Sequence, residues 1–552
     1  MMADTTADLV FTGGPVHTVD PARSRATAVA VRGERVIAVG REEVHDLIGP
    51  GTEVVDLAGR LLLPGFQDAH IHPLGAGIEL GQCHLGDSTD AREYLRRVAA
   101  YADQHRDLGW ITGGGWSLEA FPGGTPTAAM LDTIVPDRPV YLPNRDHHGA
   151  WVNTRALQLA GIDAATPDPG DGRIERDEQG NPTGMLQEGA ASLVGTLLPE
   201  VTLAEQTAAL LRAQSVLHAL GVTAWQDAIM GSYANMADPT PAYHAALDDG
   251  LLTARVVGAL WWDRARGAEQ IPELLARREA TERGRALRAT TVKIMQDGVA
   301  ENHTAAMLGP YLTGCGCASD NSGISFVDPQ ELKKYVTALD AHGFQVHFHA
   351  LGDRAVREAL DAVEAARTAN GHRDTRPHLA HLQVVHPDDI PRFRTLGATA
   401  NIQPLWAAHE PQMDELTLPF LSPERGGWQY PFGGLLRAGA TLAAGSDWPV
   451  SSPDPLEGIH VAVNRRLPHA PEGTAPFLPE QRIGLEAAIA AYTAGSAYVN
   501  HADDTGTIAP GQLADLVVLD RDPFDGPVEE IADCQVLQTF VGGERVYAAD
   551  DA

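Results

Sequence analysis

Two histidines near the start of the chain have the spacing of a metal site. His70 and His72 stand two residues apart at the end of an apolar stretch that begins at residue 63. In a β-strand, residues i and i+2 point to the same side, so both imidazoles would face one volume. Such a pair suits a borderline divalent metal such as Zn²⁺. The 22 histidines of the chain make roughly one such pair a chance event, and His347 and His349 form a second pair.

Other metal-ligand residue types lie in or at the ends of further strand-like runs. Lys293, His349, His381 and Asp447 each belong to a different run of apolar and β-branched residues. The runs end within residues 66–72, 222–227, 256–261, 291–295, 344–349, 378–381, 398–403 and 442–447. Helical patterns such as 329–341 and 354–369 lie between several of them. Eight β-then-α units in series predict an α/β fold, a (β/α)₈ barrel of the TIM type.

The barrel would bring the candidate ligands together. The carboxyl ends of the strands converge at one face of a barrel, and active sites lie there. Residues far apart in sequence would therefore become neighbours. The predicted metal ligands are His70, His72, Lys293, His349, His381 and Asp447. We expect them to hold one or two divalent ions.

The two ends of the chain read as short hairpin strands. Residues 7–14 and 28–40 near the start, and 514–520 and 538–547 near the end, are β-branched runs bounded by Gly and Asp. One small β-sandwich domain built from 1–64 and 500–552 would explain both, and two unrelated hairpins are the alternative. The barrel domain would then span 65–499. Residues 73–220 are longer than a barrel crossover needs, and we interpret them as largely a cap insertion that shapes specificity.

Composition limits the class of protein. Hydrophobic residues make up 44% and charged residues 21%, as in ordinary soluble enzymes. The formal net charge of −32 argues against nucleic acid and anionic membranes as partners. Four cysteines in 552 residues form no disulfide framework, and the Cys315–Cys317 spacing is too short for a zinc knuckle. With no leader peptide and no membrane-spanning stretch, we expect a cytoplasmic protein with reduced thiols.

Several of these segments together resemble a known family. The motifs lie at residues 63–72, 148–157, 292–298, 349–355, 445–450 and 506–516. The chain resembles the amidohydrolase superfamily over nearly its whole length, and within it the YtcJ-like branch (amidohydrolase family 3). That branch includes the N-substituted formamide deformylases. The resemblance also suggests a homodimer.

The resemblance implies a role for each candidate ligand. His70 and His72 match the first-strand ligands, and Lys293 stands where many relatives carry a carboxylated lysine that bridges two metals. His349 matches the fifth-strand ligand, with His347 set aside. His381 matches the sixth-strand ligand, although Ala380 precedes it where many members have an acidic residue, and His378 and His386 are nearby competitors. Asp447 matches the eighth-strand aspartate.

Metal chemistry then suggests a mechanism. A divalent ion lowers the pKa of bound water and polarises a substrate carbonyl. Asp447 would accept the proton of the water and pass it to the leaving nitrogen.

Other residues are candidates for supporting roles. His148 and Trp116 would line the substrate pocket, where His148 would donate a hydrogen bond to the oxyanion. The alternatives are a structural role for His148 and a packing role for Trp116. Gln403 would bind substrate at the mouth, and Asp227 and Asp297 would orient the metal ligands. Loop aspartates are more often caps or turn residues. Glu188 is a weaker candidate.

The predicted reaction is hydrolysis of an amide-type C–N bond in an N-substituted formamide or another small amide. Deamination of an amino-heterocycle on the same scaffold is the alternative. Deaminases usually use one metal without a lysine bridge, so Lys293 favours the amide. A non-catalytic scaffold is the third hypothesis, but no ligand position is missing. Trp110, Trp116 and Trp151 suggest an apolar pocket for a small-molecule substrate.

Overall fold

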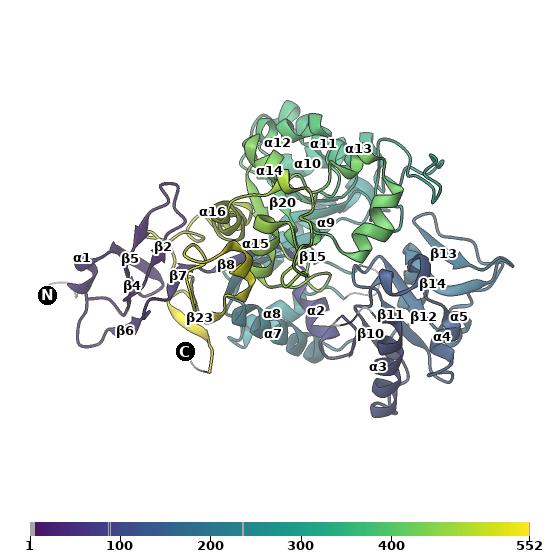
Figure 1. The fold of residues 1–552 in the computed structure, drawn as a ribbon, viewed down its shortest axis with the longest axis horizontal. Coiled ribbons are helices and arrows are strands. Elements are labelled where there is room, and N and C mark those ends of the chain that lie inside the picture. Colours follow the sequence, from purple (N-terminus) through teal and green to yellow (C-terminus); the bar gives the residue numbers. More distant parts are fainter. Residues whose placement is uncertain (1–5, 87, 89, 234–236, 551–552) are drawn as a thin grey trace.

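Eight parallel strands form the centre of the computed structural model, which describes residues 6–86, 88, 90–233 and 237–550 (Figure 1). The strands are β8 (Phe66–Ile71), β15 (Val222–Met230), β16 (Arg255–Trp261), β17 (Leu287–Met295), β18 (Gln345–Ala350), β19 (His378–His381), β20 (Thr399–Ile402) and β21 (Leu442–Ala444). Each pairs in parallel with the next. The predicted (β/α)₈ barrel is confirmed.

Contacts just beyond the last strand bring the two ends of this sheet together. The Asp447 N–H donates to the carbonyl of His70 at 2.7 Å, and the His72 N–H donates to the carbonyl of Trp448 at 2.9 Å. Gly445 makes the approach sterically feasible, because a Cβ there would lie 2.7 Å from the His70 nitrogen. This closure sets the first strand beside the residues that follow the eighth.

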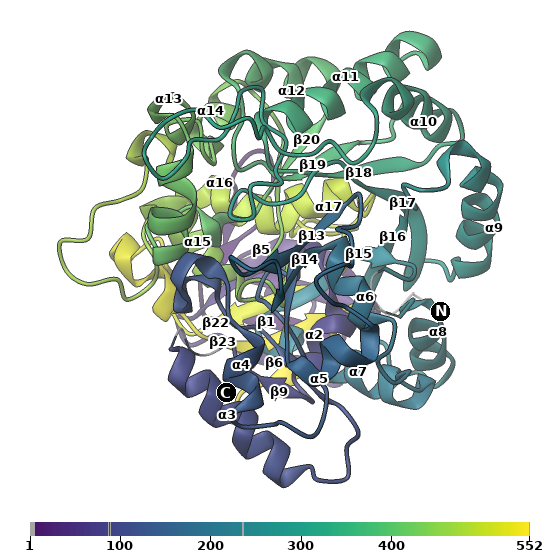
Figure 2. The ribbon, with the colours of Figure 1, turned by 90° about the vertical axis from the view of Figure 1, so that its right-hand side faces the viewer.

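The strands alternate between an apolar outer face and a polar inner face. In β18, Val346 and Phe348 join the hydrophobic core beneath the helices, whereas Gln345, His347 and His349 take the opposite face. The surrounding helices are α7 (Leu203–Ala219), α8 (Thr240–Asp248), α9 (Ile271–Thr281), α10 (Pro329–Ala341), α11 (Asp353–Asn370), α12 (Ile390–Leu396), α14 (Phe432–Arg437) and α15 (Pro455–Asn464). Figure 2 shows α9 to α12 outside strands β16 to β20.

Helix starts follow the local sequence. Thr202 and Glu205 form a reciprocal capping box at the start of α7, and Asp328 caps α10, where Pro329 occupies the first turn. Shorter helices are α1 (Glu42–His45), α2 (Pro73–Glu79), α4 (Ala128–Asp132), α5 (Thr154–Ala160), α6 (Ser192–Gly195), α13 (Pro423–Gly426), α16 (Leu485–Ala490) and α17 (Ser496–Val499). No helix in the described part of the chain is long and apolar enough to span a membrane.

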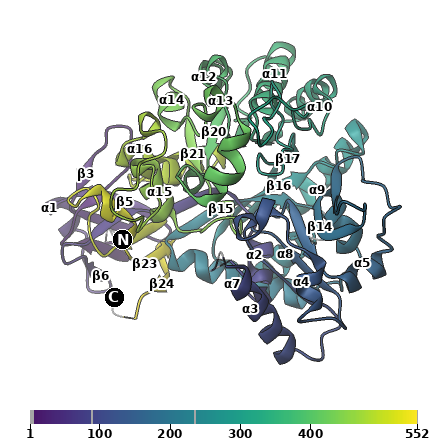
Figure 3. The same ribbon diagram turned by 45° about the vertical axis from the view of Figure 1, so that its right-hand side comes forward.

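A second, six-stranded sheet lies within the stretch predicted to be a cap. Its strands, in spatial order, are β13 (Gly172–Arg176), β14 (Pro182–Glu188), β12 (Gly149–Val152), β11 (Val140–Pro143), β10 (Ile111–Gly114) and β9 (Cys83–His84). Together with α3 (Ala91–Gln104) it stands beside the barrel in Figure 3. Helices α2 and α7, at the two ends of the stretch, pack against each other, and Arg212 of α7 donates to the carbonyl of Gly77.

Both ends of the chain contribute to two further sheets. One consists of β5 (Arg35–Gly40), β4 (Ala28–Arg32), β1 (Leu9–Thr12) and β6 (Glu53–Asp56). The other consists of β24 (Glu544–Ala548), β23 (Val536–Val541), β22 (Leu516–Leu519), β7 (Leu61–Pro64), β2 (Val16–His17) and β3 (Arg25–Ala26). Phe11, Leu62, Leu516 and Phe540 share one hydrophobic core between them. Residues 1–5 and 551–552 of the predicted terminal domain lie outside the described residues.

An ion pair between a partly buried arginine and a buried aspartate ties the barrel to the terminal sheets. Arg255, at the start of β16, contacts Asp515 through two hydrogen bonds of 2.8 and 3.0 Å. Asp515 is 3% exposed and also accepts the Gly542 N–H at 2.7 Å. An Asn at this position would leave the Arg255 charge without its carboxylate.

We therefore predict that Asp515→Asn lowers the free energy of unfolding by about 3 kcal/mol, as expected when one charged partner of a buried ion pair is removed. Urea unfolding followed by circular dichroism measures it. The matched control is Asp103→Asn, which breaks an exposed pair with Arg106 and should change little. Equal effects of the two substitutions would contradict a structural role for the buried pair.

Candidate metal centre

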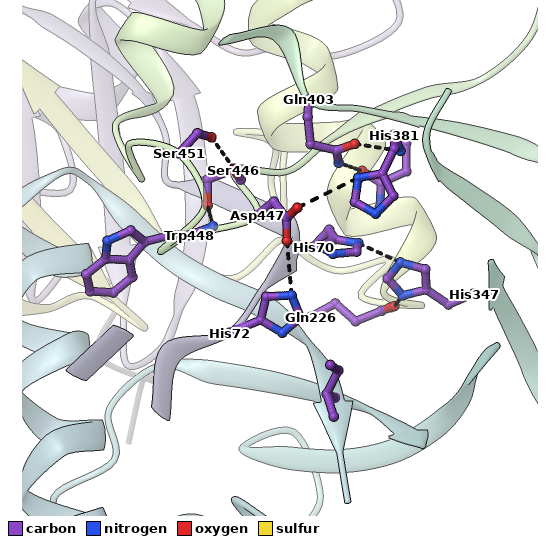
Figure 4. Close-up of polar contacts among 12 residues, drawn as sticks. His70, His72, Gln226, His347, His381, Gln403, Ser446, Asp447, Trp448 and Ser451 are labelled. Carbon is purple, nitrogen blue, oxygen red and sulfur yellow. Dashed lines mark hydrogen bonds and ion pairs between the residues drawn. The ribbon is translucent and has the colours of Figure 1, made fainter. Parts of the chain in front are cut away.

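Two imidazoles and one carboxylate converge at the carboxyl ends of the strands. One ligand atom each from His70, His381 and Asp447 lies within 4.8 Å of the others, and all three residues are buried. The Asp447 Oδ1 is 3.0 Å from Nε2 of His70 and also 3.0 Å from Nε2 of His72. The Nδ1 of His381 is 3.8 Å from Asp447 Oδ2 (Figure 4). These four residues form the candidate metal centre, called the metal centre from here on.

Backbone strain and a buried carboxylate hold this cluster. His381 and Asp447 have φ values of 79° and 59°, in the left-handed region that non-glycine residues rarely occupy. Such strain persists where the surroundings over-determine it, often at active sites. The carboxylate of Asp68 accepts the His70 N–H at 2.9 Å and the Ser446 N–H at 3.1 Å. Asp68 thereby fixes both sides of the barrel closure.

A chain of hydrogen bonds assigns the amide orientations in the barrel interior. The Gln345 amide nitrogen donates to the carbonyls of Arg376 and Val499, both at 2.7 Å, so its oxygen faces inward. That oxygen accepts from the Gln226 amide nitrogen at 3.1 Å. The Gln226 oxygen therefore points the other way, 2.7 Å from Nδ1 of His347. Because an amide oxygen only accepts, this Nδ1 must carry the proton.

The same logic reaches His70. With its proton on Nδ1, His347 presents a lone pair at Nε2, which lies 2.8 Å from Nδ1 of His70 and accepts from it. His70 is then left with a lone pair at Nε2, and this nitrogen faces the Asp447 carboxylate oxygen. The lone pairs of His70 Nε2 and Asp447 Oδ1, 3.0 Å apart, repel each other. A cation bound beside them would instead be coordinated by both atoms.

Buried imidazole nitrogens without hydrogen-bond partners also fit a divalent metal. Both ring nitrogens of His381, and Nδ1 of His72, are buried without a hydrogen-bond partner within the described part of the chain. Buried polar atoms of this kind need a partner. Trp406 stacks on the His381 ring at 5.4 Å with an interplanar angle of 6°, which fixes its plane. Imidazole nitrogens with one carboxylate form a donor set that Zn²⁺ accepts.

Burial keeps the imidazoles neutral. Desolvation, assisted by the Lys293 charge, lowers the pKa of His70 to about 3. Burial likewise lowers the pKa of His381 well below its usual range, together with the charges of neighbouring histidines. It also lowers the pKa of Lys293 to about 7, against the attraction of Asp447. Burial alone would raise the pKa of Asp447, but a proton on His70 or His72 would outweigh burial and hold the pKa of that carboxyl well below its usual range.

Lys293 and His349 lie near the centre, and His349 is outside the group of closest ligand atoms. Lys293 is 3% exposed on the inner face of β17 and acts electrostatically on His70 and His381. The His349 ring centroid is 4.5 Å from that of His381, and its Nε2 lies 3.4 Å from the carbonyl of Gly298. The direct contact with His70 comes from His347, which is not among the ligands predicted from the sequence, and not from His349.

His148 reaches this region from the cap. Its Nδ1 is 2.9 Å from Glu188 Oε2, and its ring centroid is 5.5 Å from that of His349. Burial opposes a charge on His148, but Glu188, with smaller contributions from the charges of Asp146 and Asp447, raises the pKa of His148 to about 9. A protonated His148 is therefore held beside the site, as a donor to an oxyanion requires.

Three predicted supporting residues have other partners. Trp116 is fully buried in the cap core, where it packs against Phe121 and Trp151 and donates to the carbonyl of Leu142. Trp116 thus has the packing role that was the alternative for this residue. Trp151 shares this core, so neither indole indicates an apolar pocket. Gln403 is 1% exposed and accepts the His381 N–H at 2.6 Å, so it positions a ligand instead of meeting substrate.

The two aspartates predicted to orient the ligands differ. Asp227 accepts from the Tyr243 hydroxyl at 2.9 Å and from the Ile229 N–H. Its neighbour Gln226 faces the axis, so the alternation of the strand turns Asp227 outward, toward Tyr243. Asp297 accepts three backbone N–H groups and lies 3.9 Å from Nε2 of His349, so it fixes the loops around that histidine.

Sequence reasoning missed part of the centre's support. Gln226, His347 and Asp68 each hold a predicted ligand or its neighbour in place. His378 donates to the Gln226 oxygen at 3.0 Å and belongs to this supporting network, not to the metal centre. A signal was available for Asp68 and His347, because both lie in histidine-bearing segments already singled out. Nothing in the sequence marks Gln226.

Solved structures share this architecture. An uncharacterized metal-dependent hydrolase from Pyrococcus furiosus superposes with a TM-score of 0.70 at 26% identity, covering 94% of this chain and 100% of that one. The chain therefore shares the fold of a metal-dependent hydrolase, with candidate metal donors at the strand ends where barrel active sites lie.

The family follows from sequence comparison. A family model described as "Amidohydrolase family" matches residues 53–547, and this chain belongs to the amidohydrolase family. Protein LONG AFTER FAR-RED 3 of Arabidopsis thaliana is 32% identical, covering 99% of this chain and 92% of that protein. Putative amidohydrolase YtcJ of Bacillus subtilis is 29% identical, with 98% and 99% covered. N-substituted formamide deformylase of Arthrobacter pascens is 26% identical, with 98% of each covered. The resemblance to the YtcJ-like branch is confirmed.

The outward position of Asp227 gives a prediction for stability. Burial raises its pKa in the folded protein to about 7, above the value of 3.8 expected when the chain is unfolded. The unfolded chain therefore loses its proton first as pH rises, and this carboxyl lowers stability progressively between about pH 4 and pH 7.

Asp227→Asn removes the titrating group. We expect the difference in the free energy of unfolding, variant minus native protein, to increase by on the order of 2–4 kcal/mol from pH 4 to pH 7. Above pH 7 this difference should stay constant. Unfolding curves at several pH values measure the difference. A difference that does not change with pH would contradict the assignment.

Proposed function

We propose that this protein hydrolyses an amide-type C–N bond of an N-substituted formamide or another small amide. The observation that carries the proposal is the His70 Nε2 lone pair facing Asp447, with His381 and His72 beside it. The name of the relative from Arthrobacter pascens points to the same substrate class.

The metal centre would hold one ion through His70, His72, His381 and Asp447, and we propose Zn²⁺. A second ion would use Lys293, carboxylated as in many relatives, together with His349. When bound, such ions supply an activated water and an electrophile for the carbonyl oxygen. The low pKa of Lys293, about 7, leaves much of its amine uncharged at neutral pH, which carboxylation requires.

The chain's own residues would move the protons. The Asp447 carboxylate, ionised at neutral pH, would accept a proton from the attacking water and deliver it to the leaving nitrogen. His148, kept protonated by Glu188, would donate a hydrogen bond to the developing oxyanion. Gln403 would keep His381 in place through its backbone N–H.

Deamination of an amino-heterocycle is the second candidate. The group of closest ligand atoms, from His70, His381 and Asp447, has the size of a one-metal site. One tightly bound ion per chain with an unmodified Lys293 would favour this reaction, and two ions would favour amide hydrolysis.

The substrate class can be tested directly. Metal-reconstituted protein is offered N-substituted formamides, N-acyl amines and lactams, and then amino-heterocycles. Release of formate or another carboxylate with an amine supports the proposal, and release of ammonia supports deamination. Turnover of neither class by metal-loaded protein would reject both and favour a non-catalytic scaffold.

Asp447→Asn separates binding from proton transfer. We expect the variant to retain metal, because the amide oxygen still ligates, and to lose turnover by roughly 10²–10⁴-fold, because the amide cannot accept a proton. Elemental analysis and the release assay measure the two properties. Full activity of the metal-loaded variant would disprove the role of Asp447.

Gln226→Leu tests the hydrogen-bond chain behind His70. The leucine cannot accept from Nδ1 of His347, so the His70 tautomer is no longer selected, and we expect metal affinity to fall about 10–100-fold. Metal retained during dialysis against graded chelator measures it. The control is Gln214→Leu, because Gln214 is another buried glutamine but bonds to the backbone of Leu251 and Thr253. Equal losses in both variants would show a general packing effect.

A further inference from the structure

Two cysteines are held side by side on a hairpin between β17 and α10. An antiparallel bridge joins Leu312 to Ala318. Inside it, the Thr313 N–H donates to the carbonyl of Cys317 at 2.7 Å, and the Gly316 N–H donates to the carbonyl of Thr313 at 2.8 Å. These are the bonds of a tight hairpin whose last turn residue takes a left-handed conformation. Gly316 supplies it with a φ of 77°, and its Cβ direction is open.

The turn brings the two sulfurs together at the surface. The Sγ atoms of Cys315 and Cys317 lie 3.1 Å apart, and both residues are exposed. The Thr313 hydroxyl lies 3.1 Å from the Cys315 Sγ. A thiolate on Cys315 would thus meet one hydroxyl and one thiol that can each donate to it.

The other two cysteines have the opposite environment. Cys83 and Cys534 are buried, and burial raises their pKa values to about 12 and about 11. Hydrogen bonds from Thr313 and from Cys317 lower the pKa of Cys315 to about 7. Because the thiolate is the reactive form, Cys315 is expected to be reactive and the two buried thiols inert.

We propose that Cys315 and Cys317 form a dithiol site that exchanges with low-molecular-weight disulfides of the glutathione class and closes to a disulfide within the hairpin. The turn geometry carries the proposal, because it presents both sulfurs to the same solvent-exposed side. The nucleophile is Cys315, and Cys317 resolves the mixed disulfide.

The chemistry balances in two exchanges. The Cys315 thiolate attacks one sulfur of oxidised glutathione, forms a mixed disulfide and expels one glutathione thiolate with its electron pair. The Cys317 thiolate then attacks the Cys315 sulfur and expels the second glutathione thiolate. Both leaving thiolates take up the protons that the two cysteines released. The protein dithiol is oxidised and one glutathione disulfide is reduced to two thiols.

The product should be easily reversed. A disulfide between residues separated by a single glycine closes a very small ring, and strained or exposed disulfides are the readily reduced ones. The same loop also supplies Asn302, which donates to the carbonyl of His148, and Thr304, which donates to Glu188. The dithiol therefore belongs to a loop whose base contacts residues of the proposed site.

The test is mass spectrometry of the full-length protein after incubation with oxidised glutathione. No Lys or Arg lies between Lys293 and Lys333, so trypsin releases residues 294–333 as one peptide that contains Cys315 and Cys317 and neither buried cysteine. We expect this peptide to lose two hydrogens, and reduced glutathione in excess should restore them. Thiol titration of the native protein should fall from two rapidly reacting groups to none.

Single substitutions supply the controls, and both positions are exposed, so folding should be retained. Cys317→Ser should stop at the mixed disulfide, with glutathione retained on Cys315. Cys315→Ser should react more slowly, because the remaining thiol lacks the contact to Thr313. An unchanged peptide in the native protein, or a stable glutathione adduct without closure, would overturn the proposal. So would equal reaction rates of the two variants.

Discussion

The closure of the barrel between β8 and the residues after β21 is the contact on which the rest of the site depends. Two backbone hydrogen bonds, from Asp447 to His70 and from His72 to Trp448, set residues from opposite ends of the barrel side by side. Gly445 permits the approach, and Asp68 accepts N–H groups from both sides of it. Without this contact, the carboxylate of Asp447 would lose His70 and His72 as neighbours.

The interior of the barrel explains why the imidazoles are ready to bind a cation. Buried polar groups must be satisfied by one another, and each bond in such a network limits the next. The network begins at backbone carbonyls bound by Gln345, passes through Gln226 and His347, and ends at His70. Burial keeps these histidines neutral and leaves lone pairs where a ligand needs them. The apolar outer face of the same strands, Val346 and Phe348 among others, stabilises the barrel without affecting this inner order.

The cap and the hairpin loop illustrate two uses of the segments outside the barrel. The cap has its own aromatic core, in which Trp116 and Trp151 are buried. It also carries the His148–Glu188 pair that lies beside the site. The β17–α10 loop supports that pair through Thr304 and carries the exposed dithiol on its hairpin. Specificity and reactivity toward small thiols would thus reside in loops, while the barrel holds the metal centre.

The sequence by itself determined the barrel, its strands and most of the residues around the centre. It could do so because strand periodicity and the convergence of strand ends are local rules, and they place His70, His72, His381 and Asp447 together. Only the tertiary structure decided between neighbours. A shift of one residue separates the inward Gln226 from the outward Asp227, and His347 and His349 face the same side, so spacing could not say which contacts His70. Those choices depend on contacts between distant strands, which no local pattern records.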